Sequence, residues 1–144
     1  MKRTIPLALL LVACGTIPYQ IPDSTPTAFL SFEHEGDVAE YFYLPEANTC
    51  RGRQLIGRIG PGFPMKSTSN QYDNLVPADR EISIMINLIP AGAPYTDIWC
   101  EEIVTLELQE GENYIIHTSK NIGSACRASL EFQGETSMLD LTPC

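Results

Sequence analysis

The sequence predicts a small all-β domain, an antiparallel sandwich of two sheets held together by two disulfides. Short runs of alternating apolar and polar residues, separated by turn residues, have the period of two that is typical of half-buried strands. Eleven prolines and ten glycines punctuate the chain, and no stretch of ten or more residues has a helical period. Four cysteines follow residue 14, and an even number of this kind is typical of a disulfide framework.

Three predicted strands lie in the first half of the chain. The first is the apolar run Ala28–Phe32. The second is Ala39–Leu44, in which Tyr41 and Tyr43 share one face because side chains alternate along a strand. The third is Leu55–Ile59, which follows a turn. These segments are short enough for the strands of a sandwich.

Four more strands are predicted in the second half. Glu81–Ile89 is the clearest, because four apolar residues alternate with smaller or polar ones along it. Ile98–Leu108 alternates in the same way. Tyr114–Ser119 and Arg127–Phe132 form a predicted hairpin around Asn121–Gly123.

Gly60–Pro77 is the longest stretch without a strand pattern. It contains Pro61, Gly62 and Pro64, followed by the polar run Ser67–Gln71. Clusters of this kind are typical of loops, so we expect an exposed loop here.

Length and charge restrict the domain count and the function classes. The 144 residues suit one domain, and the apolar fraction of 44% is enough for a core. The formal charge is −9, and it becomes −11 when Lys2 and Arg3 of the predicted leader are removed. A surface this acidic repels phosphate backbones and anionic headgroups, which argues against nucleic-acid binding and against a polybasic membrane contact.

The N-terminus has the organisation of an export signal. A cationic start, Met1–Arg3, precedes the apolar run Ile5–Ala13, which is far too short to span a bilayer. The run ends in Leu11-Val12-Ala13-Cys14. This motif resembles the lipobox of bacterial lipoproteins, in which a branched and a small residue precede an obligatory cysteine.

The lipobox resemblance implies a lipid anchor and a location. It implies that residues 1–13 are a signal peptide, and that Cys14 carries diacylglycerol on its sulfur and an acyl chain on its new N-terminus. Several chains on one residue make a nearly permanent anchor. Gly15 after the cysteine implies the outer membrane, facing the periplasm or the cell surface. The alternative is an ordinary secretory leader cleaved near Ala13, which leaves Cys14 as a free or paired thiol.

Residues 14–27 are predicted to be an extended tether between the anchor and a domain at 28–144. Pro18, Pro22 and Pro26 are evenly spaced in this segment. In polyproline geometry the tether would reach roughly 40 Å from the acylated cysteine.

Leu108, Gly111 and Tyr114 form the most informative motif of the mature chain. Their spacing resembles the tyrosine corner of fibronectin type III and other immunoglobulin-like sandwiches. The resemblance implies that the chain crosses here from one sheet to the other, and that the tyrosine hydroxyl binds backbone upstream. Glu110 stands where a proline is frequent, and Ile116 stands where antibody domains have a disulfide cysteine.

The corner also favours one disulfide pairing among the three that four cysteines allow. It places the predicted strands that begin near Cys100 and Cys126 beside each other, which favours Cys100–Cys126 and leaves Cys50–Cys144. The cysteines show no C-x-x-C spacing, so a zinc site or thioredoxin-like chemistry has no support.

No catalytic, metal-binding or cofactor-binding residue is predicted. The sequence contains only two histidines and has neither a G-x-S-x-G nor an H-E-x-x-H motif. Alternation places His34 on the opposite face from Glu33 and Glu35, and we expect it at a solvated strand end. His117 is expected on the outer face of its strand.

Four cationic residues form a candidate patch for an anionic partner. Arg51, Arg53, Arg58 and Lys66 lie within sixteen positions and make up more than half of the positive charge after the leader. Lipopolysaccharide phosphates, peptidoglycan carboxylates or an acidic protein would suit such a patch. The alternative is a solvated loop that balances nearby acids.

The features together predict a non-enzymatic bacterial envelope lipoprotein. It would be attached to the membrane by its lipid anchor and would bind a protein or another envelope component. The alternative is an inhibitor or immunity lipoprotein that blocks a toxin or a hydrolase. A hydrolase with dispersed carboxylates is the competing enzyme class, and it would need a cleft with perturbed acids.

Overall fold

The described part of the chain consists of strands and their connections. The computed structural model describes residues 17–21, 23–35, 38–47, 49–60, 71–89, 100–120 and 125–144. Within these residues there are eleven strands and no helix. The seven strands predicted from alternation are confirmed within these limits, and the turn predicted at 121–123 lies outside the described residues.

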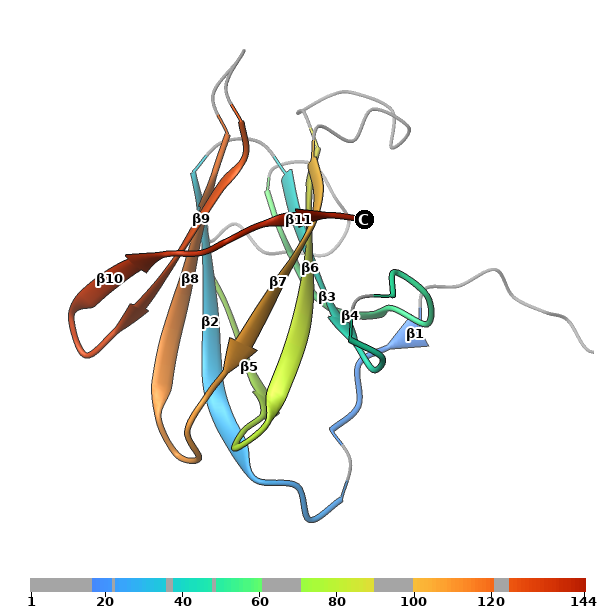
Figure 1. Ribbon diagram of the computed structural model, residues 1–144, viewed down its shortest axis with the longest axis vertical. Coiled ribbons are helices and arrows are strands. Elements are labelled where there is room, and N and C mark those ends of the chain that lie inside the picture. Colours follow the sequence, from blue (N-terminus) through green and yellow to red (C-terminus); the bar gives the residue numbers. More distant parts are fainter. Residues whose placement is uncertain are drawn as a thin grey trace, which may run out of the picture.

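The strands form two packed sheets, so the predicted β-sandwich is confirmed (Figure 1). One sheet has six strands in the order β1 (Ile17–Pro18), β4 (Gln54–Ile59), β3 (Val38–Leu44), β6 (Glu81–Ile89), β7 (Cys100–Glu107) and β11 (Thr142–Pro143). The other has five strands in the order β10 (Glu135–Met138), β9 (Arg127–Phe132), β8 (Asn113–Ser119), β2 (Thr27–Glu35) and β5 (Gln71–Pro77).

The pairing is antiparallel except at two places. β1 runs parallel to β4, and β2 runs parallel to β8 in the middle of its sheet, with Leu30 opposite Tyr114. Parallel neighbours need a long connection. Here the connection between β2 and β8 includes β3, β4, β6 and β7 of the other sheet. This central pair therefore joins parts of the sequence that are far apart.

The core lies between the sheets and is built from the inward residues of each alternating pattern. The Phe32 ring of β2 stacks on the Tyr41 ring of β3, with the ring centroids 4.1 Å apart. Ile84, Ile86 and Ile116 are almost completely buried beside them. Burial of side chains of this size stabilises the fold by roughly 1.5–3 kcal/mol each.

The outer faces of the two sheets differ. On the six-stranded sheet Phe42, Met85 and Ile103 point away from the core and yet are buried in a second apolar cluster. On the five-stranded sheet the outward side chains of Phe29 and Leu75 are 37% and 43% exposed. Among the described residues, these apolar outward positions are therefore covered on the six-stranded sheet and open on the five-stranded sheet.

The connection from β7 to β8 crosses between the sheets in the way the Leu108, Gly111 and Tyr114 motif predicts. Gly111 has a φ of +78°, a left-handed conformation that glycine adopts without strain. The Tyr114 hydroxyl accepts a hydrogen bond of 3.1 Å from the backbone N–H of Gln109. Leu108 is fully buried. The tyrosine thus satisfies a backbone donor in a bend that offers it no strand partner.

Two disulfides connect segments that are distant in sequence. Cys50 bonds to Cys144 and Cys100 bonds to Cys126, with Cα atoms 6.0 Å and 6.3 Å apart, and these are the two pairs favoured from the sequence. Cys100 is the first residue of β7, and Cys126 directly precedes β9 in the other sheet. This bond therefore ties the two layers together.

The loop predicted at Gly60–Pro77 needs correction, because β5 occupies its second half. Gln71–Pro77 pairs with β2 along seven residues, and residues 61–70 lie outside the described part. β5 is an edge strand, in which Val76 is buried and Leu75 is exposed. An edge strand with a polar first half lacks the alternation that marks strands covered on one face. The prediction also missed β10, whose residues are all exposed.

The predicted tether at residues 14–27 is partly docked on the domain. β1 pairs with the start of β4, with Ile17 opposite Gln54. The Tyr19 backbone N–H donates to the Leu55 carbonyl at 3.2 Å. A polyproline extension that is free of the domain therefore does not describe residues 17–19.

Candidate functional site

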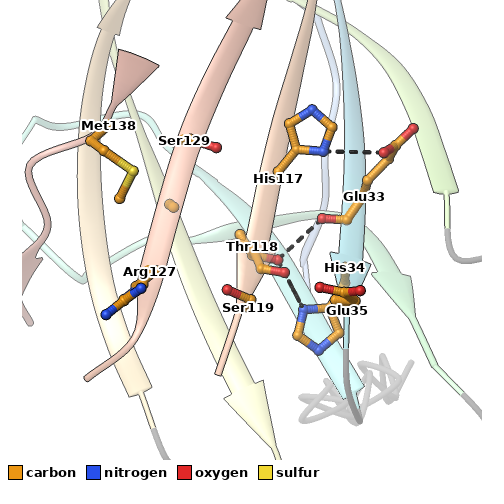
Figure 2. A pocket seen from close by; sticks show the side chains of 10 residues that line it. Glu33, His34, Glu35, His117, Thr118, Ser119, Arg127, Ser129 and Met138 are labelled. Carbon is orange, nitrogen blue, oxygen red and sulfur yellow. Dashed lines mark hydrogen bonds and ion pairs between the residues drawn. The ribbon is translucent and has the colours of Figure 1, made fainter. Parts of the chain in front are cut away.

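A depression of about 720 Å³ lies at the end of the five-stranded sheet where β2 and β8 finish and β9 begins. It extends over the open outer face toward β10 (Figure 2). Residues of these four strands line it, and they are Glu33, His34, Glu35, His117, Thr118, Ser119, Arg127, Ala128, Ser129 and Met138.

His117 is held between two carboxylates on the outer face of β8. Its Nδ1 is 3.1 Å from Glu33 Oε2 of β2, and its Nε2 is 2.7 Å from Glu131 Oε2 of β9. The outward position of His117 agrees with the prediction from alternation. A protonated imidazole can donate one N–H to each carboxylate, whereas a neutral ring can donate only one. The group is a fixed, half-buried acidic cluster that spans three strands.

This arrangement does not suit nucleophilic catalysis. Ser129 stands opposite His117 in the β8–β9 pairing, yet in the described part of the chain no hydrogen bond joins the two side chains. Both ring nitrogens of His117 already face carboxylate oxygens, so neither is placed to take a proton from Ser129. Among the described residues no three potential ligands stand close enough to share a metal ion.

His34 forms the inner wall of the depression and is buried, so the prediction of a solvated strand end is wrong. The side chain is 6% exposed, because β2 continues to Glu35 and turns this even-numbered position inward. Its Nδ1 lies 3.0 Å from Thr118 Oγ1, and the Tyr41 hydroxyl of the opposite sheet lies 2.7 Å from the same oxygen. Burial raises the pKa of the Tyr41 phenol. This network satisfies polar groups inside the core and bridges the two sheets.

Arg127 and Met138 give the rim a different character. Both are exposed, and the Met138 side chain at 69% is the most exposed large apolar residue among those described. Methionine is flexible and polarisable and adapts to varied surfaces. The depression therefore offers an acidic centre together with a cationic and an apolar group at its edge, which suits binding of a polar or cationic surface.

The arginines of the predicted cationic patch do not form one continuous site. Arg58 Nε donates a 2.7 Å hydrogen bond to the buried Glu40. Arg53 lies 3.7 Å from Glu101, and its guanidinium stacks over the Phe42 ring. Arg51 is exposed in the turn before β4. Arg53 directly precedes β4, Arg58 is near the end of β4, and Lys66 lies outside the described residues.

The predicted anchor residue Cys14 also lies outside the described residues, which begin at Ile17. Within the described part, no helix has the length and apolar character needed to cross a bilayer.

Comparisons with protein-family models, with curated proteins and with solved structures found no match to this chain.

Glu33 and Glu131 are the site residues that the sequence did not single out as partners of His117. Each is a polar residue at an outward strand position, and such residues are common on any sheet. The parallel register of β2 and β8 places Glu33 beside His117, and the sequence carries no local signal for this register.

Proposed function

We propose that the protein is a bacterial envelope lipoprotein, acylated on Cys14, whose sandwich is a non-enzymatic binding module. The observation that carries the proposal is the short apolar leader ending in Leu11-Val12-Ala13-Cys14. Two disulfides agree with an oxidising compartment outside the cytoplasm. The residue after the cysteine, Gly15, favours the outer membrane as the destination.

The open outer face of the five-stranded sheet is the proposed binding surface. It carries the depression with Glu33, His117 and Glu131, and beyond them the exposed Phe29 and Leu75. A mixed face of this kind, with an apolar area beside charged groups, fits a partner surface better than a small substrate.

The charge of the module favours a partner with cationic groups. The mature chain has seven Lys and Arg against eighteen Asp and Glu, when the leader's Lys2 and Arg3 are left out. The carboxylates of Glu33 and Glu131 focus this charge in the depression. Complementary charge accelerates association and selects against acidic partners.

The tyrosine corner supports a relationship to immunoglobulin-like modules. The hydrogen bond from Gln109 N–H to the Tyr114 hydroxyl is the interaction that the motif implies. Sandwiches of that kind are frequent in binding domains of cell surfaces. The parallel pairing of β2 with β8 departs from the antiparallel arrangement of such domains, so the relationship concerns the corner and the two-layer architecture.

Replacing Cys14 tests the anchor. We expect mass spectrometry of the mature protein to find acyl chains on Cys14, and Cys14→Ser to move the protein from the membrane to the soluble fraction. A wild-type protein with an unmodified Cys14 at the membrane would contradict the proposal.

Crosslinked purification from membranes tests the binding role. The combined Glu33→Gln and Glu131→Gln variant should lose captured partners, whereas Glu107→Gln, an exposed acid on the other sheet, should retain them. Recovery of the same envelope components in repeated experiments supports the proposed binding module. Recovery of one stoichiometric hydrolase or toxin supports the inhibitor alternative, and equal capture by both variants contradicts this face as the binding site.

A further inference from the structure

The chain pairs with the edge of the six-stranded sheet only three positions after the lipobox cysteine. β1 pairs with β4 through Ile17 and Gln54, and the Tyr19 backbone extends this contact to Leu55. The Tyr19 ring packs against Tyr43, with the ring centroids 5.2 Å apart. The chain is therefore held against the domain at residues 17–19.

Only three peptide links separate Cys14 from Ile17. A fully extended chain spans at most about 3.6 Å per residue, so these links reach about 10 Å. The free tether predicted from the prolines would reach roughly 40 Å. If Cys14 carries acyl chains, as proposed above, its backbone lies at the bilayer surface, and the β1 edge must lie within about 10 Å of it.

The residues around this edge suit a phospholipid surface. Ile17 is 55% exposed. Arg51 and Arg53 are exposed in the turn that leads into β4, directly before the Gln54 that pairs with Ile17. Arginine binds phosphate oxygens with paired hydrogen bonds. Glu46 in the same loop and Glu101 beside Arg53 are the nearby carboxylates, so the attraction is local and modest.

The depression extends toward the other side of the sandwich, because its lining runs from β2 through β8 and β9 to β10. β10 is at one edge of the five-stranded sheet, and β5 at the other edge contacts β4. Figure 1 accordingly shows β1 and the loop before β4 on one side of the molecule and β10 on the other. An attachment at β1 therefore directs the β10 side away from the bilayer.

We infer that the edge formed by Ile17, Arg51 and Arg53, here called the membrane edge, rests on the phospholipid headgroups of the bilayer that holds the acyl chains. The inference depends on the acylation proposed above and adds the orientation. The domain stands on its membrane edge, and the depression of the five-stranded sheet faces the aqueous compartment.

Tryptophan quenching in vesicles tests this orientation. Acylated mature protein, which begins at Cys14, is reconstituted into vesicles of phosphatidylethanolamine and phosphatidylglycerol that carry a headgroup-attached quencher. Ile17→Trp probes the membrane edge, and Met138→Trp, at an exposed position near the depression, is the matched control. After subtraction of the signal of the native Trp99, we expect a severalfold larger loss of fluorescence at position 17 than at position 138.

Two further variants separate the short linker from the arginines. A flexible Gly-Ser insertion between Thr16 and Ile17 should keep the protein in the membrane and reduce quenching of the tryptophan at position 17. The combined Arg51→Glu and Arg53→Glu change should also reduce it, whereas Arg127→Glu should not.

The outcomes distinguish this inference from the proposed function. Equal quenching at positions 17 and 138, in protein whose acylated Cys14 is verified by mass spectrometry, overturns the orientation and leaves the lipid anchor intact. A mature protein with an unmodified Cys14 overturns both.

Discussion

Thr118 is the residue at which hydrogen bonds between side chains connect the two sheets. Its hydroxyl lies within bonding distance of His34 in the neighbouring strand and of Tyr41 in the opposite layer. All three groups are almost completely buried. Buried polar groups stabilise a fold only when they are satisfied, and they then favour a single packing arrangement. The network thus aligns β2, β8 and β3.

The Tyr41 phenol makes stability dependent on pH in the alkaline range. Burial raises its pKa, and the hydrogen bond to Thr118 lowers it by a smaller amount. In the unfolded chain the phenol ionises near its usual pKa of about 10, so above that pH the unfolded state binds fewer protons than the folded state. The contribution is complete below about pH 10, and above it the free energy of unfolding should fall by up to about 1.4 kcal/mol per pH unit.

Urea unfolding at a series of alkaline pH values measures this effect. Tyr41→Phe should show a shallower decline than the wild type, because the phenylalanine cannot ionise. Burial also raises the pKa of Tyr19, so some decline should persist in the variant. Identical slopes for the two proteins would contradict the assignment to Tyr41.

Tyr114→Phe tests the tyrosine corner without changing the ring. The variant keeps the stacking on Phe132, whose centroid is 4.6 Å away, and loses the acceptor for Gln109 N–H. We expect the free energy of unfolding to fall by about 1 kcal/mol, the usual net contribution of one hydrogen bond. Tyr43→Phe is the control, because the hydrogen bond that its hydroxyl makes within the described residues is a long one of 3.4 Å from Arg80. A larger loss in the control would argue against a special role for the corner.

At the scale of elements, each disulfide secures a different weakness of the sandwich. Cys100–Cys126 joins the beginning of β7 to the chain entering β9 and so links the two sheets. Cys50–Cys144 ties the end of the short β11 to the loop between β3 and β4. The β11 strand of two residues has little pairing of its own, so its position depends on the second bond.

The two disulfides should contribute unequally to stability. Their sequence separations are 94 residues for Cys50–Cys144 and 26 residues for Cys100–Cys126. Restriction of the unfolded chain then predicts losses of about 4.7 and about 3.5 kcal/mol when each pair is replaced by alanine. Urea unfolding of the two double variants measures the difference. The fully reduced wild type keeps the cysteine side chains, so comparison with it shows how much stability is lost from packing around Cys100 alone. The reverse order would show that packing outweighs chain entropy here.

At the scale of the whole molecule, the sandwich is asymmetric in burial and strongly acidic. The outer face of the six-stranded sheet is covered around Phe42 and Met85, whereas the outer face of the five-stranded sheet is open. The acidic cluster around His117 lies on that open face. One sheet thus completes the core, and the other is available for binding.

The acidic excess should make stability depend on salt. The mature chain has eleven more acidic than basic residues once the leader's Lys2 and Arg3 are left out, and their mutual repulsion opposes the compact state. Raising NaCl from about 10 mM to about 150 mM shortens the Debye length from about 30 Å to about 8 Å. We expect the midpoint of urea unfolding to rise over this range. The combined change Glu110→Gln and Glu135→Gln, at two exposed positions, should reduce the salt effect, and a falling midpoint would contradict the interpretation.

Much of the fold follows from signals that are local in the sequence. The strands from Glu81 to Ile89 and from Arg127 to Phe132 are readable because alternation reflects one buried face. The motif of Leu108, Gly111 and Tyr114 is local as well, because a bend between sheets needs a left-handed residue and a nearby acceptor. From that motif the favoured disulfide pairs also follow.

The tertiary structure alone decided which distant strands are neighbours and what lies between them. The edge strand β5 begins with the polar run Gln71–Asn74 and shows no alternation, so the sequence predicts a loop there. The parallel pairing of β2 with β8 brought Thr118 to the inward His34 and Glu33 to His117. Register between strands that are distant in sequence is set by the packing of whole layers, so it cannot be predicted from a short segment.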